Sequence, residues 1–149
     1  MNPYHASAIM LDGRAIMLTG AAGSGKSSLA LQLIEHYGAT LIGDDRLILS
    51  VDGAGIHVAP HATLAGLLEL RGLGLMRLPY APSAPLGLVI NLQEDAPPRL
   101  AEADYFTFAD ESVPLLAMRG ADATTALRIR YAAQALKNGF RQDAIYRLD

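Results

Sequence analysis

Short apolar runs separated by glycine-containing turns dominate the first part of the chain. The apolar runs at residues 4–11 and 14–18 flank Asp12 and Gly13. Asp-Gly between two such runs is typical of a two-residue β-hairpin turn, which also fixes the register of the two strands. In that register His5 lies opposite Gly20.

After this hairpin, the spacing of apolar residues changes from the pattern of a strand to that of a helix. The run at residues 15–18 predicts a buried strand, and glycines follow it. Leu29, Leu33 and Ile34 then recur at helical spacing, which predicts a helix over residues 27–37. Gly38 is placed to end that helix.

The rest of the chain continues the alternation of strands and turns. We expect a strand at 40–42, a hairpin of 47–51 with 56–58 around a turn at 52–53, and strands within 86–92 and 104–116. A polar turn at 93–99 separates the last two, and a helix is expected at 121–138. The pattern predicts one α/β domain over residues 1–149, with a mixed sheet whose antiparallel part is the first hairpin.

The composition of the chain excludes several classes of protein and of site. The 149 residues include no cysteine, which excludes disulfides and thiolate metal sites. A formal net charge of −3 with mixed signs argues against nucleic acid as a partner. The N-terminal residues lack a signal-peptide pattern, and no apolar run approaches the length of a membrane span. We therefore expect a soluble, cytoplasmic protein with no membrane partner.

The glycine-rich stretch between the predicted strand and helix is a complete Walker A motif, GxxxxGKS. Its glycines let successive backbone N–H groups point at phosphate oxygens, and the helix N-terminus adds a positive dipole end. Lys26 is placed to reach the β- and γ-phosphates of ATP, and Ser27 to bind Mg²⁺. The predicted nucleotide-binding residues are Gly20, Ala21, Ala22, Gly23, Ser24, Gly25, Lys26, Ser27 and Ser28.

Charged residues after later strands are further candidates. Asp44 and Asp45 follow the predicted strand at 40–42, where one carboxylate can serve a metal ion and the other can accept a proton. A solvated acidic turn is the alternative. Glu69 and Arg71 stand in an apolar, glycine-rich stretch, so we expect them to be buried with a partner or an ion. For His5, residues alone leave two alternatives open: a phosphate-site residue or an ordinary histidine near the chain end.

Residues 68–75, LELRGLGL, are similar to the LEIRGLGI signature of the bacterial HPr kinase/phosphorylase family. The other features follow that family's order: a histidine and a hairpin, the Walker A motif, Asp-Asp-Arg after the helix, and the signature. His5 precedes Gly20 by the spacing that the family's active-site histidine has. The resemblance implies the HPr kinase/PEP carboxykinase-like form of the P-loop α/β fold, with a mixed sheet and flanking helices.

The resemblance also implies roles for single residues. Lys26 matches the P-loop lysine, Ser27 and Glu69 match the family's magnesium-binding residues, and Asp45 matches its general base. We add Asp44 to the metal-binding set from its position. Arg99 matches the family's active-site arginine, and Arg119 is a weaker match to a segment tied to phosphorolysis.

The activity implied by the resemblance is phosphorylation of a serine of the phosphocarrier protein HPr with MgATP. The resemblance also implies the reverse reaction, in which inorganic phosphate removes the phosphoryl group and pyrophosphate forms. It further implies a homo-oligomer, which in the family is a hexamer. The chain departs from the family in several places. Residues 76–85 are a short proline-rich connection, Met118 replaces a glycine, and the family's N-terminal domain is expected to be absent, as in short alphaproteobacterial forms.

Two alternatives belong to other classes. A non-catalytic module that senses ATP would need no general base, which Asp45 supplies. A P-loop small-molecule kinase would need paired arginines in a lid, but the close pair Arg128 and Arg130 falls within the predicted last helix.

Overall fold

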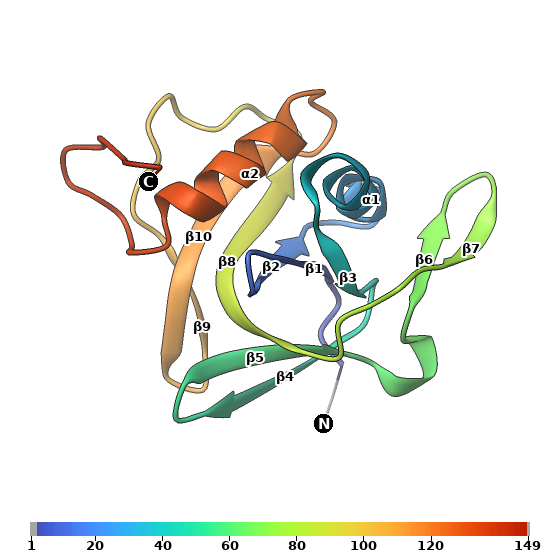
Figure 1. The fold of residues 1–149 in the computed structure, drawn as a ribbon. Helices are drawn as coiled ribbons and strands as arrows, with labels where there is room; N and C mark the ends of the chain where they lie inside the picture. Colours follow the sequence, from blue (N-terminus) through green and yellow to red (C-terminus); the bar gives the residue numbers. More distant parts are fainter. Residues whose placement is uncertain (1–2, 149) are drawn as a thin grey trace.

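The structure, a computed structural model, describes residues 3–148 and is built around an eight-stranded mixed sheet (Figure 1). The main path of the sheet has the order β3-β1-β2-β8-β10-β9, and β4 and β5 attach to it through β8. The strands are β1 (Ser7–Leu11), β2 (Arg14–Thr19), β3 (Thr40–Gly43), β4 (Leu47–Asp52), β5 (Gly55–Pro60), β6 (Leu67–Leu70), β7 (Gly74–Arg77), β8 (Ala84–Gln93), β9 (Tyr105–Phe108) and β10 (Glu111–Arg119). The helices are α1 (Lys26–Tyr37), α2 (Thr125–Ala135) and the short 3₁₀ turn η1 (Ala62–Leu64).

The first hairpin has the predicted register. Facing pairs run from Leu11 with Arg14 to Ser7 with Leu18. Asp12 and Gly13 have φ values of 52° and 79°, and two positive φ values in succession are what a type I′ turn requires. The local sequence therefore determines both the turn and the pairing.

The strand, glycine loop and helix that follow are also confirmed. Gly25 has a φ of 98° and lets the backbone turn directly from the loop into α1. Gly38, with a φ of 74°, ends the helix, and its N–H donates to the carbonyl oxygen of Leu33. The helix is one residue longer than predicted at its start.

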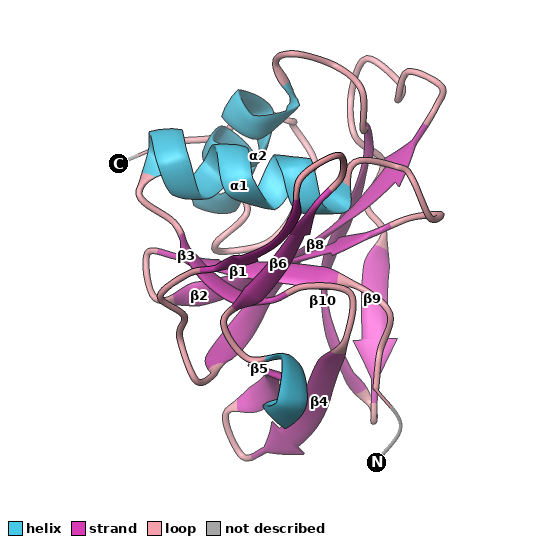
Figure 2. Cartoon of the chain, turned by 90° about the vertical axis from the view of Figure 1, so that its right-hand side faces the viewer, coloured by secondary structure: helices cyan, strands magenta, loops and turns pink. Residues whose placement is uncertain are grey.

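Side chains of the central strands pack into two cores on opposite faces of the sheet. Ile16, Leu18 and Ile90 lie under the two helices, which cover the same face (Figure 2). Met17 and Val89 point to the other face, where the β4–β5 hairpin covers them. Both faces are buried, which explains why β2 and β8 are nearly continuous apolar runs rather than alternating ones.

Two further hairpins leave the main sheet. In the β4–β5 hairpin Asp52 pairs with Gly55, so the loop is Gly53 and Ala54, one residue later than predicted. Asp52 Oδ1 accepts a hydrogen bond of 2.7 Å from the Ala54 N–H, which holds the turn there. The β6–β7 hairpin projects from the body (Figure 1), and we call residues 67–77 the arm.

The last third of the chain follows the predicted order, with a shorter helix. The chain contains β8, β9 and β10 where strands were expected, but α2 begins at Thr125 instead of residue 121. Asp122 Oδ1 accepts hydrogen bonds of 2.9 Å from both Thr124 N and Thr124 Oγ1, which stabilise a turn before the helix. These bonds lower the pKa of Asp122.

The arrangement of β2, β8 and β10 decides where a site can form. The three strands are neighbours and run parallel, with Thr19 facing Asn91 and Gln93 facing Arg119. Their carboxyl ends therefore meet at one edge of the sheet, where α/β proteins bind ligands. The glycine loop follows β2 at this edge. No helix within residues 3–148 is long and apolar enough to cross a bilayer.

Candidate active site

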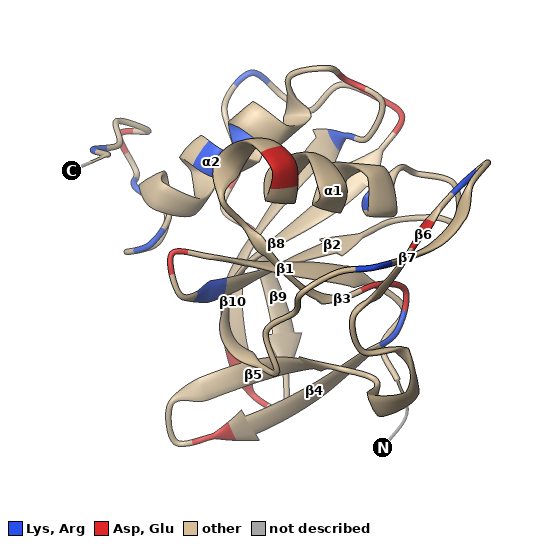
Figure 3. Cartoon of the chain, turned by 45° about the vertical axis from the view of Figure 1, so that its right-hand side comes forward, with Lys and Arg blue, Asp and Glu red and all other residues tan. Residues whose placement is uncertain are grey.

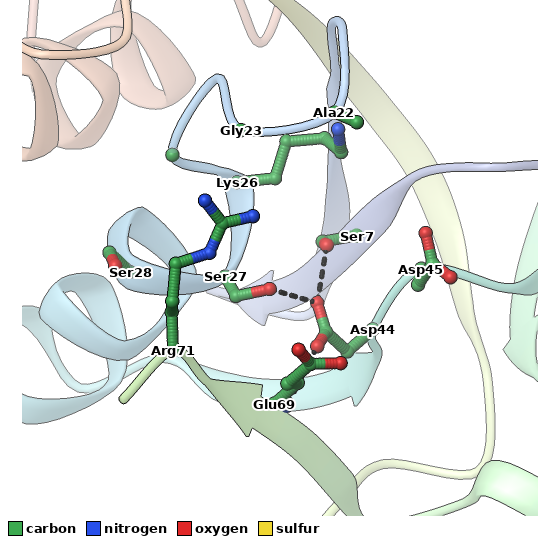
Figure 4. A pocket seen from close by; sticks show the side chains of 11 residues that line it. Ser7, Ala22, Gly23, Lys26, Ser27, Ser28, Asp44, Asp45, Glu69 and Arg71 are labelled. Atoms are coloured by element: carbon green, nitrogen blue, oxygen red, sulfur yellow. Dashed lines mark hydrogen bonds between the residues drawn. The ribbon is translucent and has the colours of Figure 1, made fainter. Parts of the chain in front are cut away.

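A cavity of about 380 Å³ opens at the start of α1 (Figure 4). Its walls come from four separate parts of the chain: the glycine loop with the first turn of α1, the start of β1, the end of β3 and the arm. Together these segments supply hydroxyl, carboxylate, ammonium and guanidinium groups. The lining residues are Ser7, Ala22, Gly23, Gly25, Lys26, Ser27, Ser28, Asp44, Asp45, Glu69 and Arg71.

The loop in front of α1, the predicted phosphate cradle, is held by hydrogen bonds of its own. Ser24 N donates to Ala21 O at 3.0 Å, and Lys26 Nζ donates to Gly20 O at 2.9 Å and Ala21 O at 3.0 Å. The ammonium group is thus folded over the loop. Gly20 permits the close packing below, since a Cβ there would lie 2.8 Å from Ser24 Oγ and 2.9 Å from Leu92 O.

Asp44 is the centre of a hydrogen-bond network at the floor of the cavity. Its side chain is buried, and Oδ1 accepts bonds from Ser7 Oγ at 2.6 Å and Ser27 Oγ at 2.8 Å. Oδ2 accepts a bond of 3.0 Å from the N–H of Glu69. This one carboxylate therefore connects β1, the start of α1 and the arm, and it orients the hydroxyl of Ser27.

Asp45 lies beside Asp44 but has a different environment. Its side chain is exposed and makes no hydrogen bond or ion pair to the residues that the structure describes, 3–148. Its φ is 66°, and a tight turn closed by Arg46 N and Asp44 O at 2.8 Å directs it to another side of the cavity (Figure 4). A left-handed conformation is uncommon outside glycine, although aspartate and asparagine adopt it more readily than most residues.

The arm contributes Glu69 and Arg71, which are not buried as we predicted. Leu68 is fully buried and anchors the arm, whereas the residues beyond it project into solvent, with Leu73 exposed by 69%. Glu69 lies next to Asp44, and the guanidinium group of Arg71 extends across the cavity toward Ser27 and Lys26 (Figure 4). Solvent, rather than a buried partner, therefore satisfies much of their charge.

His5 does not take its predicted position. The pairing of β1 with β2 stops at Ser7 and Leu18, so His5 does not pair with Gly20. The chain before β1 turns instead toward β4, where Tyr4 and Leu47 exchange backbone hydrogen bonds of 2.7 and 2.9 Å. His5 is exposed and does not line the cavity, and Ser7 occupies the corresponding wall.

The two candidate arginines are also separated from this cavity. Arg99 lines a different cavity, together with Arg128, between the 97–104 segment and β10. Arg119 lies next to the glycine loop, but in a cavity that the ends of β8 and β10 form. Sequence reasoning did not name Ser7, and it predicted a buried Arg71 rather than one that lines this cavity. The signals were the hydroxyl of Ser7 within an apolar run and the position of Arg71 two residues after Glu69.

The groups in the cavity fit a nucleotide phosphate and a magnesium ion. The cradle of N–H groups and Lys26 is suited to phosphate, and a side chain at Gly20 would fill the space on which the loop packs. Ser27, Asp44 and Glu69 offer oxygen atoms, the ligand type that Mg²⁺ requires. Within residues 3–148, no group of three or more acidic, histidine or cysteine side chains is placed to hold a metal ion. Magnesium usually binds through one or two carboxylates, together with substrate phosphates and water.

Comparison with known proteins identifies the family. The family model of the HPr Serine kinase C-terminal domain matches residues 1–97. The chain belongs to this family. The matched segment contains every residue that lines the cavity, from Ser7 to Arg71, whereas Arg99 and Arg119 lie beyond it.

Curated relatives of the HPr kinase family match the same part of the chain. The HPr kinase/phosphorylase of Mycoplasma mycoides is 34% identical over 97 residues, 60% of this chain and 31% of that protein. That of Clostridium tetani is 37% identical over 98 residues, 60% of this chain and 32% of that protein. The chain thus matches about a third of the length of these relatives.

A solved structure extends the likeness over most of the fold. The Hpr(Ser) kinase/phosphatase from Coxiella burnetii superposes with a TM-score of 0.73 at 21% sequence identity, and the match covers 87% of each chain. It confirms the predicted fold class, a mixed α/β sheet with flanking helices. The helices α1 and α2 flank the same face, and the β4–β5 hairpin covers the other (Figure 2).

The bond from Ser7 to Asp44 gives a testable prediction. Ser7→Ala is expected to lower the free energy of unfolding by about 1–2 kcal/mol, because a buried carboxylate loses a short hydrogen bond. The exposed Ser50 on β4 is the matched control, and Ser50→Ala is expected to stay within about 0.5 kcal/mol of the parent. Urea denaturation of both variants measures the difference. Equal stabilities would contradict a structural role of the Ser7 hydroxyl.

Proposed function

We propose that this chain is an ATP- and Mg²⁺-dependent kinase that phosphorylates a serine hydroxyl of an HPr-type phosphocarrier protein. One observation carries the proposal: a single cavity holds the P-loop lysine, a carboxylate fixed to the loop serine, and a second carboxylate with no hydrogen-bonded partner among the described residues. The relatives described above, which are HPr kinase/phosphorylases, support the same reaction class and the same acceptor.

The division of labour between the two aspartates suits phosphoryl transfer. Asp44 is held by three hydrogen bonds and orients Ser27, so its role is to position ligands. Asp45 is uncommitted and accessible, so it can accept the proton of an incoming serine hydroxyl. As the serine oxygen forms its bond to the γ-phosphorus, the bond between that phosphorus and the β,γ-bridging oxygen breaks and ADP leaves. Asp45 retains the proton.

Positive groups around the loop offset the charge of the transferred phosphoryl group. Lys26 would exchange its two carbonyl partners for phosphate oxygens, and Arg71 extends over the same space. Ser27, Asp44 and Glu69 would hold Mg²⁺, which when bound neutralises phosphate charge. Positioning and electrostatics of this kind supply most of the acceleration in phosphoryl transfer.

The reverse reaction uses the same groups. Inorganic phosphate in the cradle attacks the phosphorus of the phosphoserine, and the bond between that phosphorus and the serine oxygen breaks. The two joined phosphates leave as pyrophosphate, and Asp45 returns its proton to the serine oxygen. His5 and Arg99 retain predicted roles near the phosphate in this proposal. Their positions outside the cavity mean that a change of chain conformation would have to bring them there.

The alternatives receive less support from the site. A sensor of ATP has no use for an uncommitted carboxylate such as Asp45. A small-molecule kinase needs lid arginines, but Arg128 Nε donates to Thr124 Oγ1 at 3.1 Å and Arg130 Nη1 to Gln134 Oε1 at 3.1 Å. Both arginines are therefore bound to the surface of α2. Figure 3 shows basic and acidic positions spread over the described ribbon rather than gathered on one face.

Intact-mass analysis of HPr from the source organism tests the proposal. Incubation with this protein and MgATP is expected to add one phosphate to HPr and none to an HPr whose regulatory serine is replaced by alanine. Addition of inorganic phosphate without ATP should then remove that phosphate. No mass change in HPr, with MgATP binding still measurable by calorimetry, would contradict the kinase reaction and favour the sensor.

A further inference from the structure

A second cavity, of about 500 Å³, lies against the same glycine loop. Ala22 and Gly23 line both cavities, so the two meet at the tip of the loop. In the sheet order β2 lies between β1 and β8. The first cavity uses residues of β1 and the β3 end, whereas the second uses the ends of β8 and β10, so the loop stands between them.

We propose that the second cavity binds the nucleoside part of a nucleoside triphosphate whose terminal phosphate lies in the first cavity. This inference rests on the proposed function. Asp44, Asp45 and Ser27, the groups suited to transfer, all line the first cavity and none lines the second. The terminal phosphate therefore belongs in the first cavity, and the rest of the donor must continue past the loop.

Of the two directions past the loop, the one toward β8 and β10 offers more cover for a nucleoside. On the opposite side stands the arm, where Leu73 and Leu75 are 69% and 65% exposed, so a base there would stay in contact with water. The second cavity instead lies between the loop and the ends of two strands. Its volume is within the range of pockets that hold small ligands, about 300–1,000 Å³.

The lining of the second cavity matches the parts of a nucleoside 5′-phosphate. Ala22 and Ala121, which are both exposed, present apolar surface, which suits the face of a base. The exposed carboxylate of Glu94 can accept hydrogen bonds from ribose hydroxyls, and the guanidinium group of Arg119 can pair with the α-phosphate. These groups follow β8 and β10, whose carboxyl ends lie in register beside the loop.

Filling the cavity separates nucleoside binding from phosphate binding. Ala121→Trp adds bulk to the second cavity, and Ala103→Trp, at an exposed residue of the cavity that Arg99 lines, is the matched control. Calorimetry measures the binding of MgATP and of magnesium tripolyphosphate, which has the phosphates without the nucleoside. We expect Ala121→Trp to weaken MgATP at least about tenfold and to leave tripolyphosphate within about twofold. Ala103→Trp should change neither.

Several results would overturn the inference. Unchanged MgATP affinity in Ala121→Trp would place the nucleoside elsewhere, and equal losses for both ligands would mean that the substitution only disturbs the loop. A parent protein that binds tripolyphosphate as tightly as MgATP would show that no nucleoside site exists. A parent that binds neither ligand would contradict the proposed function itself. Loss of HPr phosphorylation with intact MgATP binding would contradict only that function.

A second pair of ligands tests the role of Glu94. The parent is expected to bind MgATP about fivefold to tenfold more tightly than its 2′,3′-dideoxy analogue, because the ribose hydroxyls have a carboxylate partner. Glu94→Ala should remove this difference without changing the affinity for tripolyphosphate. A preference for MgATP that survives in Glu94→Ala would contradict the contact between Glu94 and the ribose.

Discussion

Asp45→Asn is expected to lower the rate of serine phosphorylation by about 10²–10⁴-fold, because asparagine cannot accept the hydroxyl proton. The fold should be unaffected, since asparagine also adopts the left-handed conformation that this position has, with a φ of 66°. MgATP affinity should remain within about twofold, as Lys26 and Asp44 are unchanged. Single-turnover phosphorylation of HPr and calorimetry measure the two quantities separately.

Asp110 provides the matched control for this substitution. It is an exposed aspartate with a φ of 69°, in the turn between β9 and β10, and it does not line the cavity. Asp110→Asn should therefore leave the transfer rate unchanged. A rate for Asp45→Asn above about a tenth of the parent rate would be inconsistent with a general base at this position. Asp45→Gly should lose the same activity while relieving the left-handed strain.

The elements that sequence reasoning predicted well depend on neighbouring residues. The Asp12-Gly13 turn determines the β1–β2 register, and the Walker A spacing determines the loop and the start of α1. Gly38 ends that helix as predicted. In each case a few consecutive residues contain the physical cause, a turn or glycine-rich loop that needs positive φ values, so no knowledge of distant contacts is needed.

The structure places two of the predicted site residues, His5 and Arg99, away from the loop cavity. Extending the hairpin register to His5 assumed that the strand continues, but Tyr4 pairs with Leu47, more than forty residues later. Arg99 was placed from its motif alone, although the 97–104 segment packs beside β10 and away from the loop cavity. Local sequence contains no information about which distant backbone competes for a strand end.

The neighbouring residues Asp44 and Asp45 show how contacts that are distant in sequence give two similar side chains different environments. The sequence placed two carboxylates after β3, but it could not distinguish their environments. The structure separates them because Ser7, which is 37 residues away, and Glu69, 25 residues away, both contact Asp44. In the proposed function, Asp44 therefore orients ligands, and Asp45 is available for proton transfer.

Gly120→Ala is expected to weaken MgATP and tripolyphosphate alike, by about tenfold or more, and to lower the free energy of unfolding by about 1–3 kcal/mol. A Cβ on Gly120 would overlap the carbonyl oxygen of Ser24, which is a backbone atom of the glycine loop. Gly120 is held in place by a 3.2 Å bond from its N–H to Gln93 O, so the loop must move instead. A displaced loop no longer aims its N–H groups at phosphate.

Gly53 is the control, because a Cβ there would meet no atom within 4 Å and its φ is not in the left-handed region. Gly53→Ala should bind both ligands as the parent does and unfold at a similar urea concentration. If Gly120→Ala bound both ligands within about twofold of the parent, close packing of Gly120 against the loop would not be needed for the phosphate cradle. We expect Gly120→Ala to lose affinity for both ligands equally and Ala121→Trp to lose affinity for MgATP alone. These two results together would assign different functions to adjacent residues. Gly120 supports the loop that binds phosphates, and Ala121 borders the space for the nucleoside.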